Sequence, residues 1–319
     1  MRLKPSFGDH AFDPEQLPRT RSSGRDRIVV GVSSRARNDP VEWAAAEAAS
    51  RHGSLRIVHA HFWSSAAASI NALAVYAAQT AARSAAEQIV AEAARRARLV
   101  APELDITSEI VVGATAPALL RLAQHADLVV LGGRTSHRRR LRDDSVVIPV
   151  AARSAAPVAI IRPLDDVAPG PSAARVVAGV GGSDSSSSAI GFAFRAAARR
   201  GLGLTAIHAC GPPESTDTTP FLGETSRLQG PWRSLAEAMA PWLVKFPDVD
   251  VLQKLAVATP ASALAAESAG AALLVVGSRG RTRRERRHFG SVSQTVLRSA
   301  QCPAVVVRRD CHVPLGSHY

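Results

Sequence analysis

The chain repeats one pattern twice, and this repeat constrains its fold more than any other feature. The apolar run from Arg27 to Val32 in the first half matches the run from Arg175 to Val180 in the second. In both halves an alanine-rich stretch follows, and then a second apolar run that ends in a histidine, His59 or His208. An internal repeat on this scale indicates two copies of one structural unit.

Within each copy, short branched apolar runs alternate with helical stretches. Alternation of this kind is typical of α/β units with a mainly parallel sheet that is covered by helices on both faces. The sequence therefore predicts two tandem domains, each with five strands. The remaining strands are predicted at 55–59, 107–112, 127–131 and 158–162, and at 204–208, 249–257, 272–276 and 304–308; helices are predicted at 43–51, 72–99, 189–200 and 232–245.

Composition suggests where the units begin and end. Three prolines, a glycine and two aspartates between the copies are typical of a linker. We expect a flexible N-terminal tail at 1–26, a first domain at 27–162, a linker at 163–174, a second domain at 175–309 and a C-terminal tail at 310–319.

Glycines in the second copy form the pattern Gly-x2-Gly-x9-Gly-Ser. Gly277 and Gly280 follow the predicted strand at 272–276, with Arg279 between them, and Gly290-Ser291 precedes a helical stretch that opens with Val292. Glycines let the backbone approach a ligand closely, and the N–H groups of a first helical turn point at an anion. Ser291 can cap the helix or bond a ligand oxygen. The pattern predicts a phosphate site.

This pattern, together with the helix end and strand from Ser299 to Arg308, resembles the universal stress protein family. Resemblance to a tandem member implies a five-stranded parallel sheet in each domain and ATP as ligand, with Mg as a further candidate. The first copy departs from the signature: it keeps Gly132, but Thr135 and Asp144 stand where Gly280 and Gly290 do. An Asp at that helix start would repel a phosphate, so nucleotide is expected in the second copy alone.

The second copy departs from the family after its first strand, where the usual Asp is replaced by Gly181. The nucleoside is expected near Gly181, Gly182 and Ser183. The same loop offers a rival interpretation, because Gly181-Gly182-Ser183-Asp184 resembles the pyrophosphate loop of ATP pyrophosphatases, which adenylate their substrates. The alternative without a ligand is a helix cap by Ser183 or Asp184, and short motifs of this kind favour it.

The sequence gives little support for catalytic or metal-binding chemistry. The histidines His59 and His208 are expected to be packing and hydrogen-bonding residues, and Cys302 to be buried. The sequence contains no catalytic or metal-binding motif, so no catalytic residue and no metal site are predicted. The basic loops at 138–142 and 281–287 suit either phosphate contacts or solvated surface.

Charge and composition limit the classes of partner that can be expected. The net charge is +12, but only 4% of residues are aromatic and no basic-aromatic interleaving occurs, so nucleic acid is not favoured. A cytoplasmic protein without a membrane span is expected. Three functions follow: an ATP-binding regulatory module of the stress response with an unidentified protein partner, an interaction module that has lost nucleotide, or an adenylating enzyme that uses the loop at 181–184. The resemblance also implies pairing through the fifth strands, which would join the two domains of one chain and leave either a monomer or a homodimer of tandem chains.

Overall fold

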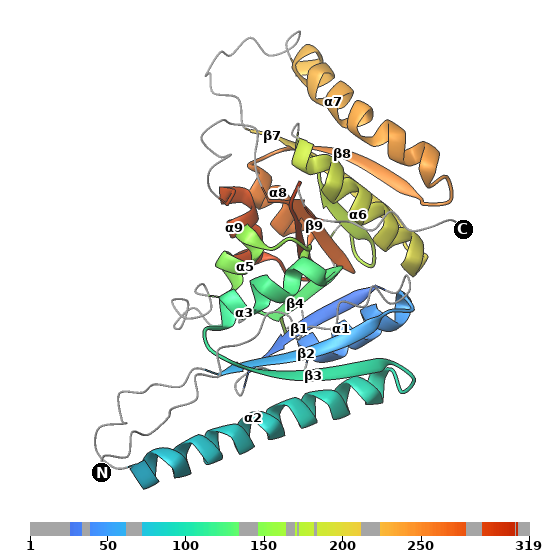
Figure 1. The fold of residues 1–319 in the computed structure, drawn as a ribbon. Helices are drawn as coiled ribbons and strands as arrows, with labels where there is room; N and C mark the ends of the chain where they lie inside the picture. The colour runs from blue at the N-terminus through green and yellow to red at the C-terminus, as the bar shows by residue number, and fades with distance from the viewer. Residues whose placement is uncertain are drawn as a thin grey trace.

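The computed structural model describes residues 26–33, 39–61, 72–133, 146–163, 170, 172–181, 184–211, 224–278, 289–309 and 311. Strands and helices alternate through both copies (Figure 1). The first copy consists of β1 (Arg27–Val32), α1 (Asp39–Ser50), β2 (Ser54–His61), α2 (Ala72–Val100), β3 (Asp105–Val112), α3 (Thr115–Leu122), the short 3-10 helix Ala123–His125, β4 (Leu128–Gly132), α5 (Val147–Arg153) and β5 (Val158–Ile161).

The second copy follows the same order of elements. It consists of β6 (Val176–Gly179), α6 (Asp184–Arg200), β7 (Leu204–Cys210), α7 (Glu224–Lys245), β8 (Val251–Val257), α8 (Pro260–Glu267), β9 (Leu273–Gly277), α9 (Ser291–Ser299) and β10 (Ala304–Val307).

All ten strands belong to one sheet, in the order β3-β2-β1-β4-β5-β10-β9-β6-β7-β8. Within each copy the neighbouring strands are parallel. The copies join where β5 and β10 pair antiparallel, with Ala159 opposite Val305. We call this junction the seam. The expected pairing of the two domains through their fifth strands is confirmed.

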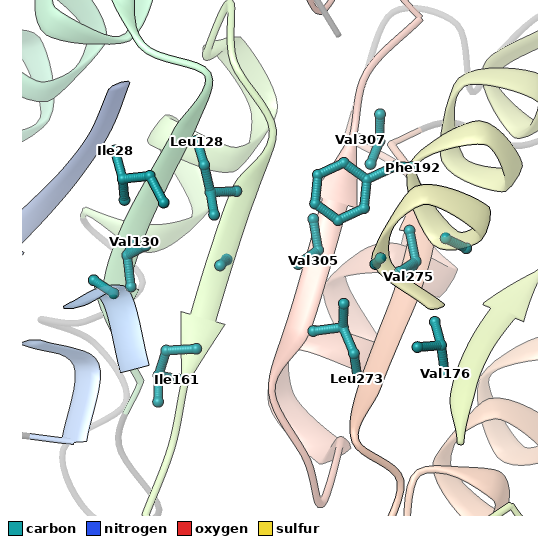
Figure 2. Close-up of a cluster of buried hydrophobic side chains, with 14 of the residues drawn as sticks. Ile28, Leu128, Val130, Ile161, Val176, Phe192, Leu273, Val275, Val305 and Val307 are labelled. Atoms are coloured by element: carbon teal, nitrogen blue, oxygen red, sulfur yellow. The ribbon is translucent and has the colours of Figure 1, made fainter. Parts of the chain in front are cut away.

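Side chains of the central strands alternate between the two faces of the sheet. Ile28 and Val130 belong to a hydrophobic cluster with residues of α1, α2, α6 and α7, whereas Val29 and Val129 belong to a cluster with α3, α5, α8 and α9. Both clusters contain residues of both copies. Figure 2 shows the first of them, with Ile161 of β5 and Val305 of β10 among its members. The hydrophobic core is therefore continuous across the seam.

The predicted α/β class, with helices on both faces of a mainly parallel sheet, is confirmed. Nearly every predicted strand agrees with the structure to within two residues at each end. Helices α3 and α8 were not predicted, although α8 carries a recognisable start signal: the Thr259 hydroxyl accepts from the Ser262 N–H at 3.3 Å, and Pro260 is its first residue. Both helices have eight residues, which is too short for a clear helical period.

Polar contacts cross the seam on both faces of the sheet. On the α5 and α9 face, Arg162 Nη1 donates to the Ala300 carbonyl at 3.3 Å, and Arg308 Nη1 donates to the Ser154 carbonyl at 3.2 Å. These two bonds are related by the repeat, because each arginine directly follows the fifth strand of its copy. On the other face, Glu47 of α1 contacts Arg200 of α6.

Glu47 is the central carboxylate of that second contact. Its side chain is only 3% exposed, and it accepts from Arg51 Nε at 2.7 Å and lies 3.6 Å from Arg199 Nη2. Burial raises the pKa of Glu47, but the charges of Arg51, Arg200 and Arg199 outweigh burial and hold its pKa below the ordinary 4.5. The carboxylate is therefore ionised in the folded protein at neutral pH.

Replacing Glu47 with Gln should lower the free energy of unfolding by about 3 kcal/mol, because it leaves buried guanidinium groups without their carboxylate. Glu87→Gln is the matched control, since Glu87 pairs with Arg83 on an exposed surface of α2 and should change stability by less than about 0.5 kcal/mol. Urea unfolding of the three proteins measures both values. Equal effects of the two substitutions would contradict the role of Glu47.

The contribution of Glu47 should depend on pH. Its folded pKa lies below the unfolded value of 4.5, so its stabilisation is complete above pH 4.5 and is lost as the pH falls through the folded pKa. The difference in unfolding free energy between the wild type and Glu47→Gln should therefore stay constant from pH 7 to about 5 and shrink in more acidic buffer. Unfolding curves at each pH test this, and a difference that grows on acidification would contradict it.

Candidate functional site

The candidate site lies at the carboxyl ends of β6 and β9, which are adjacent parallel strands. The helices that follow these two strands lie on opposite faces of the sheet. After β6 it enters α6, which packs with the first hydrophobic cluster, and after β9 it reaches α9, which packs with the second cluster on the other face. A crevice outside two strand ends of this kind is where open α/β sheets bind ligands.

Helix α9 begins beside the carboxyl end of β9. Gly290 is its N-cap, with φ −61° and ψ 140°, and no side chain caps the helix. The Gly290 N–H donates to the Ser278 carbonyl at 3.0 Å, which fixes the helix start beside the end of β9. Within the described residues, no acceptor is bonded to the N–H groups of Ser291, Val292 and Ser293. Such free amides at the positive end of a helix attract an anion.

Three further residues hold this turn, and the sequence analysis did not identify them. The Ser293 hydroxyl donates to the Gly277 carbonyl at 2.7 Å, and Gln294 Nε2 donates to the Phe289 carbonyl at 3.0 Å. Ser278 is 3% exposed, and its N–H donates to the Val307 carbonyl at 3.0 Å. Their polar side chains within or beside apolar runs were the available signal.

The corresponding part of the first copy is built differently. Helix α5 begins at Val147, which aligns with Ser293, whereas α9 begins at Ser291. Its N-cap, Val146, has helical φ and ψ angles of −111° and −53°. Asp144 and Thr135 lie outside the described residues. The described part of the first copy thus lacks the glycine-capped helix start of the second.

The loop after β6 contributes the other wall of the crevice. The Gly181 N–H donates to the Ser186 hydroxyl at 3.0 Å, so this amide is already bonded within the protein. His208 of β7 is 6% exposed, and its Nδ1 donates to the Val180 carbonyl at 2.7 Å. His59 makes the same bond to Val32 in the first copy at 3.0 Å. The interpretation of both histidines as packing and hydrogen-bonding residues is confirmed.

The predicted site residues divide into two groups. The structure places Gly277 at the end of β9, Gly290, Ser291 and Val292 at the start of α9, and Gly181 just beyond the neighbouring β6. The predicted residues Arg279, Gly280, Gly182 and Ser183 lie outside the described residues, as do the basic loops at 138–142 and 281–287. The two strand ends and the helix start that the sequence analysis combined are therefore neighbours in the fold.

Reactive groups elsewhere are few. Cys302 is buried as expected, and burial raises the pKa of its thiol to about 12, so it is not a nucleophile at neutral pH. Over the described ranges no three His, Cys, Asp or Glu side chains come together as a metal site. None of the helices in the described part of the chain has the length and apolar character that crossing a membrane requires.

Comparison with known proteins gives a consistent result. The model of the Universal stress protein family matches residues 24–162 and 173–308. Universal stress protein Rv2005c of Mycobacterium tuberculosis is 37% identical over 228 residues, covering 70% of this chain and 77% of that protein. Universal stress protein Rv1996 of the same species is 32% identical over 315 residues, covering 90% and 97%.

A solved structure shares the whole arrangement. The crystal structure of a universal stress protein from Archaeoglobus fulgidus covers 89% of this chain and 96% of its own, with a TM-score of 0.62 and 17% sequence identity. That likeness concerns the fold, whereas the two matches to the family model and the two mycobacterial relatives concern the sequence. The chain belongs to the universal stress protein family, of which it carries two tandem domains.

Proposed function

We propose that this protein is a regulatory module of the stress response that binds ATP in its second domain, and that the first domain is a structural partner. The observation that carries the proposal is the start of α9. Gly290, Ser291 and Val292 present main-chain N–H groups beside the ends of β6 and β9, and phosphate groups bind to helix starts of this type.

The nucleotide would be held by the main chain rather than by reactive side chains. In this proposal the phosphates contact the turn at Gly277 and the helix start at Gly290, and the nucleoside lies along the ends of β6 and β7 near Gly181 and His208. Ser291 is exposed at the first helical position and is free to bond a phosphate oxygen. Mg would accompany the phosphates from the solvent side.

A second function is favoured by one feature of the same crevice. Gly181 stands where most family members carry an Asp, so the carboxylate that resembling members place near the adenosine is missing. A domain without it would act as an interaction module that no longer needs nucleotide. The adenylation hypothesis receives less support, because the Gly181 N–H that a pyrophosphate would need is bonded to Ser186.

Replacing Gly290 with Asp should weaken ATP binding at least tenfold, or about 1.4 kcal/mol, because it places a carboxylate where the phosphates bind. The fold should be retained, since Asp is a favourable N-cap residue. Gly290→Asn is the matched control: it has the same size and capping ability without the charge, and it should lose less affinity. Isothermal titration calorimetry of the three proteins gives the affinities, and thermal unfolding confirms that they fold.

The same titration separates the alternatives. Absence of ATP binding by the intact chain would support the interaction module, and unchanged binding by Gly290→Asp would place the nucleotide elsewhere. Release of AMP and pyrophosphate that stops in Asp184→Ala would support adenylation.

The first domain holds the other end of the same helix. The Ala300 carbonyl at the end of α9 accepts from Arg162, whose guanidinium is mostly buried, and burial lowers its pKa from 12.5 without removing the charge at neutral pH. A cation at a helix C-terminus stabilises the helix. In the proposed function, the first domain thereby fixes the helix whose start binds phosphate.

Arg162→Met should therefore weaken ATP binding about threefold to fivefold, through loss of a helix-terminal cation. Arg308→Met is its symmetry-related control, because Arg308 makes the equivalent bond to α5, which binds no phosphate in this proposal. Both substitutions should lower the melting temperature, but only Arg162→Met should change ATP affinity. Equal losses of affinity in both variants would contradict a specific role for Arg162.

A further inference from the structure

A second group of charged residues lies at the seam, on the face of α1 and α6 rather than at the α9 helix start. Figure 1 shows the end of α6 next to α1. Arg199 and Arg200 end α6, so the length of this helix, about 25 Å at 1.5 Å per residue, separates them from the loop after β6. We call this group the seam charge cluster; its members are Asp26, Glu47 and Arg51 of the first copy and Arg195, Arg199 and Arg200 of the second.

The seam charge cluster contains more arginines than carboxylates. Arg51 lies within 2.5 Å of Glu47 and 3.3 Å of Asp26, so it contacts both. Arg200 also contacts Glu47. Arg199 is left with a long contact of 3.6 Å to the same Glu47. Four guanidinium groups therefore face two carboxylates, and the cluster carries a net charge of about +2 at neutral pH.

Arg195 has no carboxylate within salt-bridge distance among the described residues. Its guanidinium lies 6.0 Å from the ring centre of Trp242, a cation–π contact, and it donates no hydrogen bond to another described residue. Nε of Arg199 is also buried without a hydrogen-bond partner. Burial, with a smaller effect of the nearby Arg51, lowers the pKa of Arg195 and of Arg199 to about 10. Both remain charged at neutral pH.

Uncompensated charge in such a place is unfavourable. The Arg51 side chain is 4% exposed and those of Arg199 and Arg200 are 20% exposed, so water screens the repulsion among them only in part. A bound oxyanion would remove this repulsion and bond the unused donors, since the guanidinium fork matches the oxygens of a phosphate group.

We propose that the seam charge cluster is a second anion site, which binds a small oxyanion of about two negative charges, such as a phosphate group. The anion would contact Arg195 and Arg199 on the partly exposed side of the cluster, because among the described residues Arg195 has no carboxylate within salt-bridge distance and Arg199 has only the long contact to Glu47. Because the bound anion would offset the repulsion between Arg51 of the first copy and these two arginines of the second, it would strengthen the seam. The proposal does not depend on ATP binding at α9.

Thermal unfolding in phosphate tests the site. The Gly290→Asp protein is used, so that the α9 helix start does not contribute. Sodium phosphate should raise its melting temperature in a saturable manner by about 3 °C relative to sodium chloride of equal ionic strength. Arg195→Met combined with Arg199→Met should abolish the rise. Arg83→Met, which removes one charge from the exposed surface of α2, is the control that should keep it.

A comparison of two ligands identifies the source of the phosphate group, and a further variant keeps the test possible if the double variant does not fold. AMP that acts at a lower concentration than inorganic phosphate would assign the site to a nucleotide, and the reverse would assign it to free phosphate. Arg195→Gln disturbs no ion pair and replaces the double variant if that protein does not fold. A melting temperature that phosphate raises no more than chloride does, or a rise that persists in the arginine variants, would overturn the proposal.

Discussion

The antiparallel pairing of β5 with β10 is the constraint on which the rest of the structure depends. It joins two parallel half-sheets into one and brings both hydrophobic clusters across the seam. Val158, Ala159, Val305 and Val306 are almost fully buried there. Two apolar strands that would otherwise be exposed edges, and so prone to pair with other chains, cover each other instead.

The same pairing lets the first domain support the second, although the sequence of the first copy lacks the phosphate signature. Because the copies are related by antiparallel strands, the residue after each fifth strand reaches the last helix of the other copy: Arg162 contacts Ala300, and Arg308 contacts Ser154. Helix α9 thus has its start in the candidate site and its end against the first domain. The described part of the first copy has no glycine-capped helix start, but it still supports the end of α9.

Much of the fold could be predicted from the sequence, because apolar runs such as Leu273 to Val276 are covered on both faces and leave a continuous signal. The short helices α3 and α8 escaped prediction, since eight residues hold barely two turns. At the candidate site, the spacing of the glycines and Ser291 could be recognised in the sequence. The supporting hydrogen bonds of Ser293, Ser278 and Arg162 could not be predicted, because they join segments that come into contact only in the folded sheet.

The seam charge cluster is a second feature that could not be predicted from the sequence. Arg51 and Arg200 occupy equivalent positions in the two copies, and each alone reads as a solvated residue near a helix end. Antiparallel joining of the sheets brings α1 and α6 together, so that arginines from both copies share Glu47. Because both copies carry an arginine at this helix end, pairing through the fifth strands brings like charges together. The buried carboxylate of Glu47 offsets part of that repulsion, but Arg199 lies 3.6 Å from it and Arg195 forms no ion pair with a described residue.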